Sequence, residues 1–445
     1  MSRFAQRIRS ASSAAGTIAR RAGDLIDSMG VVAHLAAARY TTDLVTPTEV
    51  VDACSYLGLE HVRTNLVRGS AITARDDLVA GGIKLHYTTL MRAGGSTVSI
   101  DERIQDITDN SNHFLASSDS VEPFNEYDGS GDGSWVSVLR AAQPYLFNQA
   151  RAQLNGVAVL GPALIGNNMV TTAPQIQLAN DGLPLSTYFD FGNLHSYFGG
   201  RQPESAYADN TQDFTPSVTP TNDITFDERL GLLATYISHQ KPVIVTEMGY
   251  HNDPTSTTHK YTSLQAAGVY VPRAYLETFR IGIRRSYVYE LLDEPTTSPS
   301  YEQHFGFFDM NGVAKPAAVY LHNLTSLLHD AGATALTFTP QRLAYRFSGS
   351  SGALTDLRSV LFQKTNGVFW LALWQGISVF DYTNGTDSTP FPASQSVTLA
   401  LNQPATVTFF QDTEVDTIGG GTSLGLQTSC TLSVGPRVSL VRIAV

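Results

Sequence analysis

Short apolar segments recur between residues 29 and 330, and each of them ends in polar or reactive side chains. Apolar runs of this kind are typical of strands that are buried on both faces. Eight such segments are present, beginning at Met29, His61, Gly82, Ser120, Gly156, Phe189, Lys241 and Arg285. We therefore expect eight buried strands in this part of the chain.

Helix patterns with start signals lie between these segments. Thr46, Pro47 and Glu49 supply an N-cap, a proline at the first helical position and an acid in the first turn, while Thr225 and Glu228 form a capping box. Strands that alternate with helices predict an α/β fold with a parallel sheet. Eight such units favour a closed (β/α)8 TIM barrel over an open sheet.

The pattern changes after about residue 330. Stretches such as "RSVLFQKTNGVFWLALWQG" alternate apolar and polar residues and are separated by Asn-Gly and Gly-rich turns. This predicts a C-terminal all-β sandwich domain over residues 331–445, after a barrel over residues 29–330. Residues 1–28 are expected to form a helix or a linker, because their Arg-rich start lacks the continuous apolar region of a signal peptide.

Composition excludes several classes of function. The chain has 445 residues, 42% of them apolar, and a net charge of −11, which is typical of a soluble globular protein. Binding to nucleic acid is not expected, because it needs a concentrated positive face. No apolar run approaches the ~18–20 residues that span a membrane. Cys54 and Cys430 belong to no CxxC pair, so we expect neither a disulfide framework nor a zinc site.

The strand ends carry the candidate chemistry, because side chains at the carboxyl ends of barrel strands converge on one face. Glu126 follows the fourth segment and Glu247 ends the seventh, in "KPVIVTEMGYHND". Burying an unpaired carboxylate in a strand costs several kcal/mol of stability. We therefore expect Glu247 to have a partner and a functional role. The candidates at the strand ends are His34, Arg63, His86, Asn125, Glu126, His195, Tyr197, Glu247, Tyr289 and Glu290.

Two carboxylic acids on one face of a barrel predict glycoside hydrolysis. In the retaining route the two groups lie about 5–5.5 Å apart, one as the nucleophile and the other as the acid/base. We assign Glu247 as the nucleophile, which Arg63 would keep ionised, and Glu126 as the acid/base, which must hold a proton.

The motifs "FNEYD" and "VTEMGY" resemble the acid/base and nucleophile motifs of clan A glycoside hydrolases, and residues 29–330 resemble the family 5 cellulase-like and family 39-like pattern in outline. The resemblance implies a retaining glycosidase in which Asn125 holds the sugar 2-hydroxyl and Tyr197 hydrogen-bonds the nucleophile. The residues that match the clan pattern, in strand order, are Arg63, His86, Asn125, Glu126, His195, Tyr197 and Glu247.

Several residues beside the two carboxylates are expected to bind substrate. Clan A members commonly carry a Trp at the end of strand eight, where this chain has Tyr289 and Glu290. The identity of the sugar therefore stays open. For His34 and His86, a structural role as buried, hydrogen-bonded side chains is as well supported as contact with the substrate. The substrate-binding candidates are Arg63, Asn125, His195, Tyr197, His34, His86, Tyr289, Glu290 and Trp135, the last from a glycine-rich loop.

We therefore expect a retaining glycoside hydrolase that acts on a β-linked glycan or oligosaccharide. A transglycosylase would use the same residues, and an inactive carbohydrate-binding protein would keep the barrel as a scaffold. A metal-dependent hydrolase is disfavoured because the sequence has no HExxH motif, and no cofactor is expected. The oligomeric state and the compartment stay open, with export favoured by a polysaccharide substrate.

Overall fold

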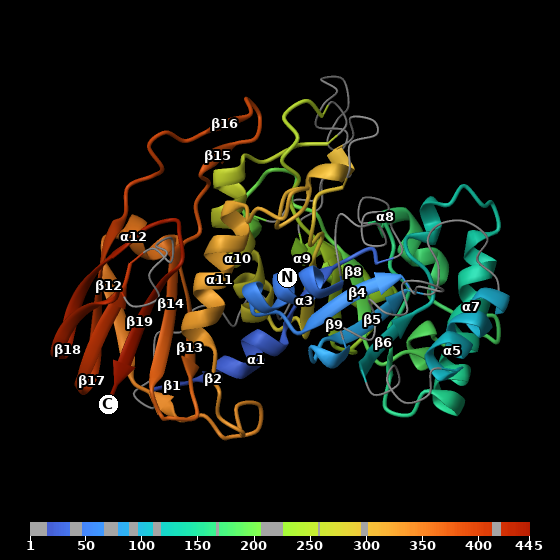
Figure 1. Cartoon of the computed structure of the whole chain (residues 1–445), viewed down its shortest axis with the longest axis horizontal. Helices are drawn as coiled ribbons and strands as arrows, with labels where there is room; N and C mark the ends of the chain where they lie inside the picture. The colour runs from blue at the N-terminus through green and yellow to red at the C-terminus, as the bar shows by residue number, and fades with distance from the viewer. Residues whose placement is uncertain are drawn as a thin grey trace.

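The computed structural model describes residues 16–35, 47–65, 79–88, 97–109, 117–165, 169–205, 226–256, 259–294, 301–411 and 420–445. It consists of a barrel of parallel strands surrounded by helices and a sheet domain built mainly from the C-terminal third of the chain (Figure 1). None of the helices in these stretches is long and apolar enough to cross a membrane.

The barrel contains eight parallel strands in the order β7-β6-β5-β4-β3-β10-β9-β8. The sheet closes between β7 and β8, where Leu160 and Phe191 form a parallel bridge and the Gly161 N–H donates to Phe191 O at 2.9 Å. The predicted (β/α)8 fold is therefore confirmed. The strands are β3 (Met29–Val32), β4 (His61–Asn65), β5 (Lys84–Thr88), β6 (Ser118–Glu122), β7 (Ala158–Val159), β8 (Gly192–His195), β9 (Val243–Met248) and β10 (Arg285–Val288).

Alternation along the strands separates two apolar layers. Val31 and Val245 belong to the large cluster that packs the strands against the helices. Their neighbours Val32 and Ile244 belong to a smaller cluster that also contains the aromatic ring of Tyr287. Successive side chains of a strand point to opposite faces, so the smaller cluster fills the barrel interior.

Helices follow the barrel strands. They are α3 (Pro47–Leu57), α5 (Thr97–Asp109), α7 (Trp135–Gln153), α8 (Met169–Thr172), α9 (Phe226–Tyr236), α10 (Leu264–Ile281) and α11 (Pro316–Leu328). Short 3₁₀ turns are η3 (Tyr127–Gly129), η5 (Ala173–Ile176), η6 (Leu185–Tyr188), η7 (Pro203–Ser205) and η9 (Tyr301–His304). The expected helix caps Thr46 and Thr225 lie outside the described residues.

Local signals define α10 at both ends. The Ser263 hydroxyl accepts from the Ala266 N–H at 2.9 Å as an N-cap, and Gly282 ends the helix with a φ of 96°, a conformation that favours glycine. Within the helix, Gly268 allows close packing on α11, because a Cβ there would lie 2.8 Å from the Tyr320 ring. The pair α10 and α11 thus covers the side of the barrel that faces the sheet domain (Figure 1).

The C-terminal sheet has the order β12-β17-β19-β14-β13-β2, and β18 pairs with β17. The long strand β17 changes partner along its length, since Val397–Leu401 pairs with β12 and Thr406–Phe410 pairs with β19. The elements are β12 (Tyr345–Gly349), α12 (Ser351–Thr355), β13 (Leu357–Gln363), β14 (Phe369–Gln375), β17 (Gln395–Phe410), β18 (Thr422–Val434) and β19 (Ser439–Ala444). A separate apolar cluster fills this domain, as the predicted sandwich requires.

The described part of the N-terminal segment contributes to the C-terminal sheet. Strand β1 (Thr17–Ile18) pairs with β11 (Arg342–Leu343), and β2 (Arg20–Arg21) pairs with β13. Helix α1 (Ala22–Asp27) then leads into β3. The domain boundaries at residues 28 and 330 stay predictions. The pairings of β1 and β2 connect the N-terminal segment to the C-terminal domain.

Candidate active site

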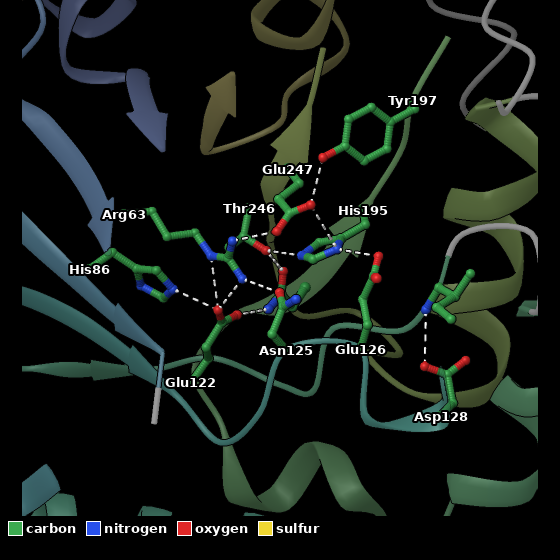
Figure 2. Close-up of polar contacts among 12 residues, drawn as sticks. Arg63, His86, Glu122, Asn125, Glu126, Asp128, His195, Tyr197, Thr246 and Glu247 are labelled. Carbon is green, nitrogen blue, oxygen red and sulfur yellow. Dashed lines mark hydrogen bonds and ion pairs between the residues drawn. The ribbon is translucent and has the colours of Figure 1, made fainter. Parts of the chain in front are cut away.

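The polar side chains of the candidate site come from the carboxyl ends of β4, β6, β8 and β9 and from the loops that follow them (Figure 2). Arg63 lies in β4, Glu122 ends β6, His195 ends β8 and Glu247 lies near the end of β9. All four side chains are buried. The barrel topology thus brings together residues that lie up to 184 positions apart in the sequence.

An irregularity in β9 directs two successive side chains toward the site. The register of β9 shifts by one residue against both neighbours, between Leu194 and His195 on β8 and between Ser286 and Val288 on β10. A bulge of this kind re-aims the side chains of a strand. As a result both Thr246 and Glu247 bond to residues of the site, where a regular strand would point one of them outward.

Glu247 is held as an ionised group. Arg63 Nη1 donates to Glu247 Oε1 at 2.7 Å, and the Tyr197 hydroxyl donates to Glu247 Oε2 at 2.6 Å. Burial alone would raise the pKa of Glu247, but the charges of His195 and Arg63 and the hydrogen bond from Tyr197 hold it below its ordinary value. The Tyr197 contact is the one that the family resemblance implied.

Arg63 is itself fixed by a second buried carboxylate, Glu122. Arg63 Nε and Nη2 both donate to Glu122 Oε1, at 2.9 and 2.6 Å, and Nη2 also donates to Asn125 Oδ1 at 2.7 Å. Asn193 Nδ2 donates to the other oxygen of Glu122. Burial raises the pKa of Glu122, but the charge of Arg63, together with His86 and His195, outweighs burial and the pKa falls to about 2. Glu122 therefore anchors the guanidinium that faces Glu247.

Glu126 and Glu247 both lie at the Nδ1 edge of the His195 ring, whose Nε2 edge faces Thr246 (Figure 2). Its backbone has a φ of 46° and a ψ of 47°, a left-handed conformation that costs free energy for a residue with a side chain and recurs at functional sites. Glu126 Oε1 lies 2.8 Å from His195 Nδ1, which in turn lies 3.5 Å from Glu247 Oε2. One ring nitrogen of His195 thus contacts both candidate catalytic carboxylates.

The hydrogen bonds of His195 fix where its protons lie. The Thr246 hydroxyl donates to Asn193 Oδ1 at 2.6 Å, so its oxygen must accept the hydrogen bond that it makes with His195 at 2.9 Å. His195 Nε2 therefore carries a proton and donates it to that bond. With Nε2 protonated, the contact between His195 Nδ1 and Glu126 holds one further proton, carried by either group. Burial lowers the pKa of His195, but the charges of Glu247 and Glu126 outweigh burial and raise it. The site therefore stores a proton next to Glu126.

The two catalytic candidates lie close to each other. One oxygen of Glu126, one oxygen of Glu247 and a ring nitrogen of His195 all lie within 4.8 Å of one another. The Glu126 side chain is 12% exposed and that of Glu247 is 9% exposed, so the pair borders solvent while Glu122, fully buried, does not. A substrate can reach the first two carboxylates but not the third.

An aromatic wall continues from Tyr197. The ring of Tyr289 lies 6.4 Å from that of Tyr197 and 5.1 Å from that of Phe305, centroid to centroid. His34 packs on Tyr289 at 5.4 Å, and its Nδ1 lies 3.7 Å from Glu294 Oε1. Burial, followed by the charge of the buried Glu290, raises the pKa of Tyr289 well above its ordinary value. Tyr289 is therefore a neutral surface beside Tyr197.

Two of the predicted substrate-binding residues lie apart from Glu126 and Glu247. His86 is fully buried, with Nδ1 2.7 Å from Ser120 Oγ and Nε2 3.4 Å from Glu122 Oε1, so its contacts are with residues beneath Arg63. Trp135 begins α7 and packs against the large core cluster, rather than lying in an extended loop. A direct role of either residue in substrate binding stays a prediction.

Sequence reasoning missed three residues of this network, namely Glu122, Asn193 and Thr246. Glu122 gave a usable signal, because it ends a buried strand as Glu247 does, in "SVEPFNEYD". Asn193 and Thr246 gave none, since their roles depend on which hydroxyl and amide atoms face His195 and Glu122 across the barrel.

Two groups among the described residues have the spacing of metal ligands. Glu126, His195 and Glu247 form one, and His34, Glu290 and Glu294 form the other, with ligand atoms within 4.8 Å in each group. In the first group, the Arg63 cation already lies 2.7 Å from Glu247 Oε1. Its charge opposes a second cation there, so we assign the first group to proton chemistry and assign no metal to either.

No protein-family model matches the sequence, and no curated protein matches it. Solved structures match its fold. A family 39 glycoside hydrolase from Bacteroides cellulosilyticus WH2 superposes with a TM-score of 0.62 at 12% identity, over 95% of this chain and 82% of that one. A glucosidase from Croceicoccus marinus gives 0.60 at 12% identity, over 97% and 98%.

A third match is a monomeric β-xylosidase from Caulobacter crescentus CB15, with a TM-score of 0.56 at 12% identity over 96% of this chain and 98% of that one. Each match extends over both the barrel and the sheet domain of this chain. The predicted resemblance to clan A glycoside hydrolases is thus confirmed at the level of the fold. Identities this low show the fold alone, so the chemistry must be argued from the site.

Proposed function

We propose that the protein is a retaining glycoside hydrolase that cleaves a β-linked glycan or oligosaccharide by double displacement. The observation that carries the proposal is the pair of carboxylates Glu126 and Glu247, with oxygens within 4.8 Å, of which one is held ionised and the other lies beside a stored proton. This spacing suits a direct attack by a carboxylate and leaves little room for an intervening water.

In the first step Glu247 attacks the anomeric carbon while the bond to the leaving oxygen breaks. Its charge makes it the nucleophile, and Arg63 Nη1 holds Glu247 Oε1 so that Oε2, which accepts from the Tyr197 hydroxyl, faces the substrate. Glu126 gives the leaving oxygen the proton that it shares with His195 Nδ1 across 2.8 Å, which leaves Glu126 as a carboxylate and His195 protonated at Nε2 only.

In the second step a water molecule replaces the leaving group. Glu126, now a carboxylate, takes a proton from the water. The water oxygen attacks the anomeric carbon, and the bond from that carbon to Glu247 breaks. The Tyr197 hydroxyl again bonds the departing carboxylate, and the raised pKa of Tyr197, due mainly to burial, keeps that hydroxyl protonated. Two inversions at one carbon retain the anomeric configuration.

The sheet domain and barrel together match enzymes named as a glucosidase and a β-xylosidase, so glucosides and xylosides are the first substrates to test. Purified protein should release nitrophenol from a 4-nitrophenyl β-glycoside in a panel that includes both sugars. An inactive sugar-binding protein would bind such compounds without hydrolysis. A transglycosylase would instead extend an added sugar acceptor in preference to releasing the free sugar.

A further inference from the structure

A cavity of about 400 Å³ lies between the loop that follows β8 and a hairpin of the C-terminal domain. The hairpin consists of β15 (Phe380–Asp381) and β16 (Thr386–Asp387), which extend from the sheet domain beside the barrel loops at the top of the view (Figure 1). Arg201 and Gln202 line the barrel side, and Phe380, Asp381, Tyr382 and Ser388 line the other.

The two walls are held together at the cavity itself. The Arg201 guanidinium lies 4.2 Å from the centroid of the Tyr382 ring, and its Nη2 donates to the Tyr382 hydroxyl at 3.1 Å. The Tyr250 hydroxyl donates to Arg201 O at 2.8 Å, which fixes the backbone of the same residue. Arg201 is therefore positioned before any ligand arrives.

A glycine permits the close approach of loop and hairpin. Gly200 has a φ of 78°, and a Cβ there would lie 2.7 Å from Tyr261 O and 3.0 Å from the Tyr382 Cβ. On the far side, the Tyr261 hydroxyl donates to Gly385 O at 2.8 Å, and Ser263 bonds Asp387. Backbone and side-chain contacts therefore hold the hairpin against the barrel on two sides.

A buried ion pair supports the base of the cavity. Glu204 in η7 accepts from Arg273 Nε of α10 at 2.8 Å and from Trp374 Nε1 of β14 at 2.6 Å. Arg273 Nη1 also donates to Ile377 O at 3.0 Å, just before the hairpin. Three elements from both domains thus meet at one carboxylate. A preformed cavity pays little ordering entropy when a ligand binds.

The lining is suited to a neutral sugar. Its one cation, Arg201, is balanced by one carboxylate, Asp381, so the described lining gives no net attraction for an ion. Tyr382 supplies aromatic surface, while the guanidinium, the amide of Gln202 and the hydroxyl of Ser388 supply donors and acceptors. Sugars combine an apolar face of C–H groups with a rim of hydroxyls, which is the pattern that such a lining complements.

The cavity is close to the candidate active site along the chain. Arg201 lies four positions after Tyr197, so their Cα atoms lie at most about 14 Å apart. Tyr197 contacts the nucleophile at 2.6 Å, and between the two positions Phe198 stacks on Tyr250 at 5.2 Å. One loop therefore contributes both to the candidate catalytic centre and to the wall of the cavity.

We propose that this cavity is a remote subsite that binds a sugar unit of a neutral, β-linked oligosaccharide whose scissile bond lies between Glu126 and Glu247. This inference rests on the proposed function and deepens it, because it assigns oligosaccharides rather than monoglycosides as the substrate class. It also gives the C-terminal domain a part in substrate recognition.

The test compares a short and a long substrate of the same sugar. kcat/KM is measured for a 4-nitrophenyl monoglycoside and for a hexasaccharide in the wild type and in the Tyr382→Ala and Ser388→Phe variants. The first variant removes the aromatic surface, and the second fills the cavity. Thr383→Ala, exposed on the same hairpin and outside the lining, is the matched control.

Both cavity variants should lose about tenfold in kcat/KM on the hexasaccharide, equivalent to about 1.4 kcal/mol, with no change on the monoglycoside or in the control. Equal losses on both substrates would mean that the hairpin only supports the Tyr197 loop, and would overturn the proposal. Unchanged kinetics on both substrates would overturn it too.

A binding measurement separates this inference from the proposed function. Calorimetric titration of the Glu247→Ala protein with β-linked hexasaccharides of glucose and of xylose should show binding that Tyr382→Ala weakens about tenfold. If the wild type hydrolyses no glycoside, the proposed function fails, while binding that depends on Tyr382 would still support the cavity as a sugar site. Absence of any such binding would overturn the subsite itself.

Discussion

The two ends of the barrel both bury a network of charged side chains, and the balance of charge differs between them. At the amino ends of the strands, Asp27 pairs with His61 at 3.1 Å and with Arg284 at 2.9 Å, and Arg285 bonds Asp119. Two carboxylates there face two arginines and a histidine. At the carboxyl ends, the described residues set Glu122, Glu126 and Glu247 against one arginine, Arg63, and the imidazoles of His195 and His86.

The contrast is sharpest within β4, where His61 and Arg63 are two positions apart and belong to opposite networks. Burial lowers the pKa of His61 at the balanced end, whereas neighbouring carboxylates raise the pKa of His195 at the acidic end. Buried charge alone therefore does not identify a functional site. An excess of buried carboxylates over cations does identify one, because it forces the site to hold a proton beside Glu126.

The largest effect is expected from removing the nucleophile. Glu247→Ala should lower kcat on an aryl β-glycoside by about 10⁴-fold or more, because no other group can form the glycosyl bond. Added azide or formate should restore turnover and give the product of inverted configuration, since the small anion attacks from the vacated side. Retained product in the rescue reaction would argue against Glu247 as the nucleophile.

Glu126→Ala should differ in kind. Substrates with a good leaving group need no protonation and should still form the glycosyl-enzyme, which would accumulate until azide releases a product of retained configuration. Substrates with a poor leaving group should lose about 10²–10⁴-fold in rate. Mass spectrometry of the quenched reaction detects the covalent adduct. If this variant shows the phenotype described for Glu247→Ala, the two roles are reversed.

Matched substitutions at the two ends test the comparison itself. Arg63→Met should cost about 3–5 kcal/mol of stability, because it leaves the buried Glu122 and Glu247 without their cation. Arg285→Met should cost less, because Asp27 keeps its contact with Arg284 and Asp119 borders solvent. The activity per folded molecule should fall only in Arg63→Met, by about 10²-fold, since Glu247 would lose the charge that keeps it ionised. If Arg63→Met does not fold, Arg63→Lys supplies the charge without the bidentate contact. Loss of activity in folded Arg285→Met would contradict the distinction.

Thr246→Val tests the stored proton with a smaller effect. The hydroxyl accepts from His195 Nε2 and so stabilises the protonated ring. Its removal should lower the pKa of His195, and activity on the alkaline side should then be lost at lower pH. One hydrogen bond corresponds to a shift of about half to one pH unit. A pH profile of kcat/KM measures the shift, and an unchanged alkaline limb would refute the role of His195.

No effect is expected from metal removal. Both oxygens of Glu247 are engaged by Arg63 and Tyr197, and the proposed steps use only protons and the two carboxylates. Activity should survive exhaustive dialysis against a chelator. If activity is lost and only a divalent ion restores it, one of the two groups with the spacing of metal ligands must hold a metal. The proposed mechanism would then be wrong.

The sequence predicts the barrel because parallel strands buried on both faces leave continuous apolar runs, and it places Glu126 and Glu247 because the ends of such strands converge. The left-handed backbone of Glu126 and the bulge that turns Thr246 and Glu247 inward leave no comparable pattern. The strands β1 and β2 are two residues long, too short for any periodicity. These features depend on contacts between distant segments rather than on local preference.

The central claim is that Glu126 and Glu247 act as a retaining pair, and proton NMR of the wild-type reaction tests it most directly. The anomeric signals of the product are followed from the first minutes, before mutarotation mixes them. We predict that the β-anomer appears first from a β-linked substrate. Initial appearance of the α-anomer would show a single displacement by water and would contradict the account.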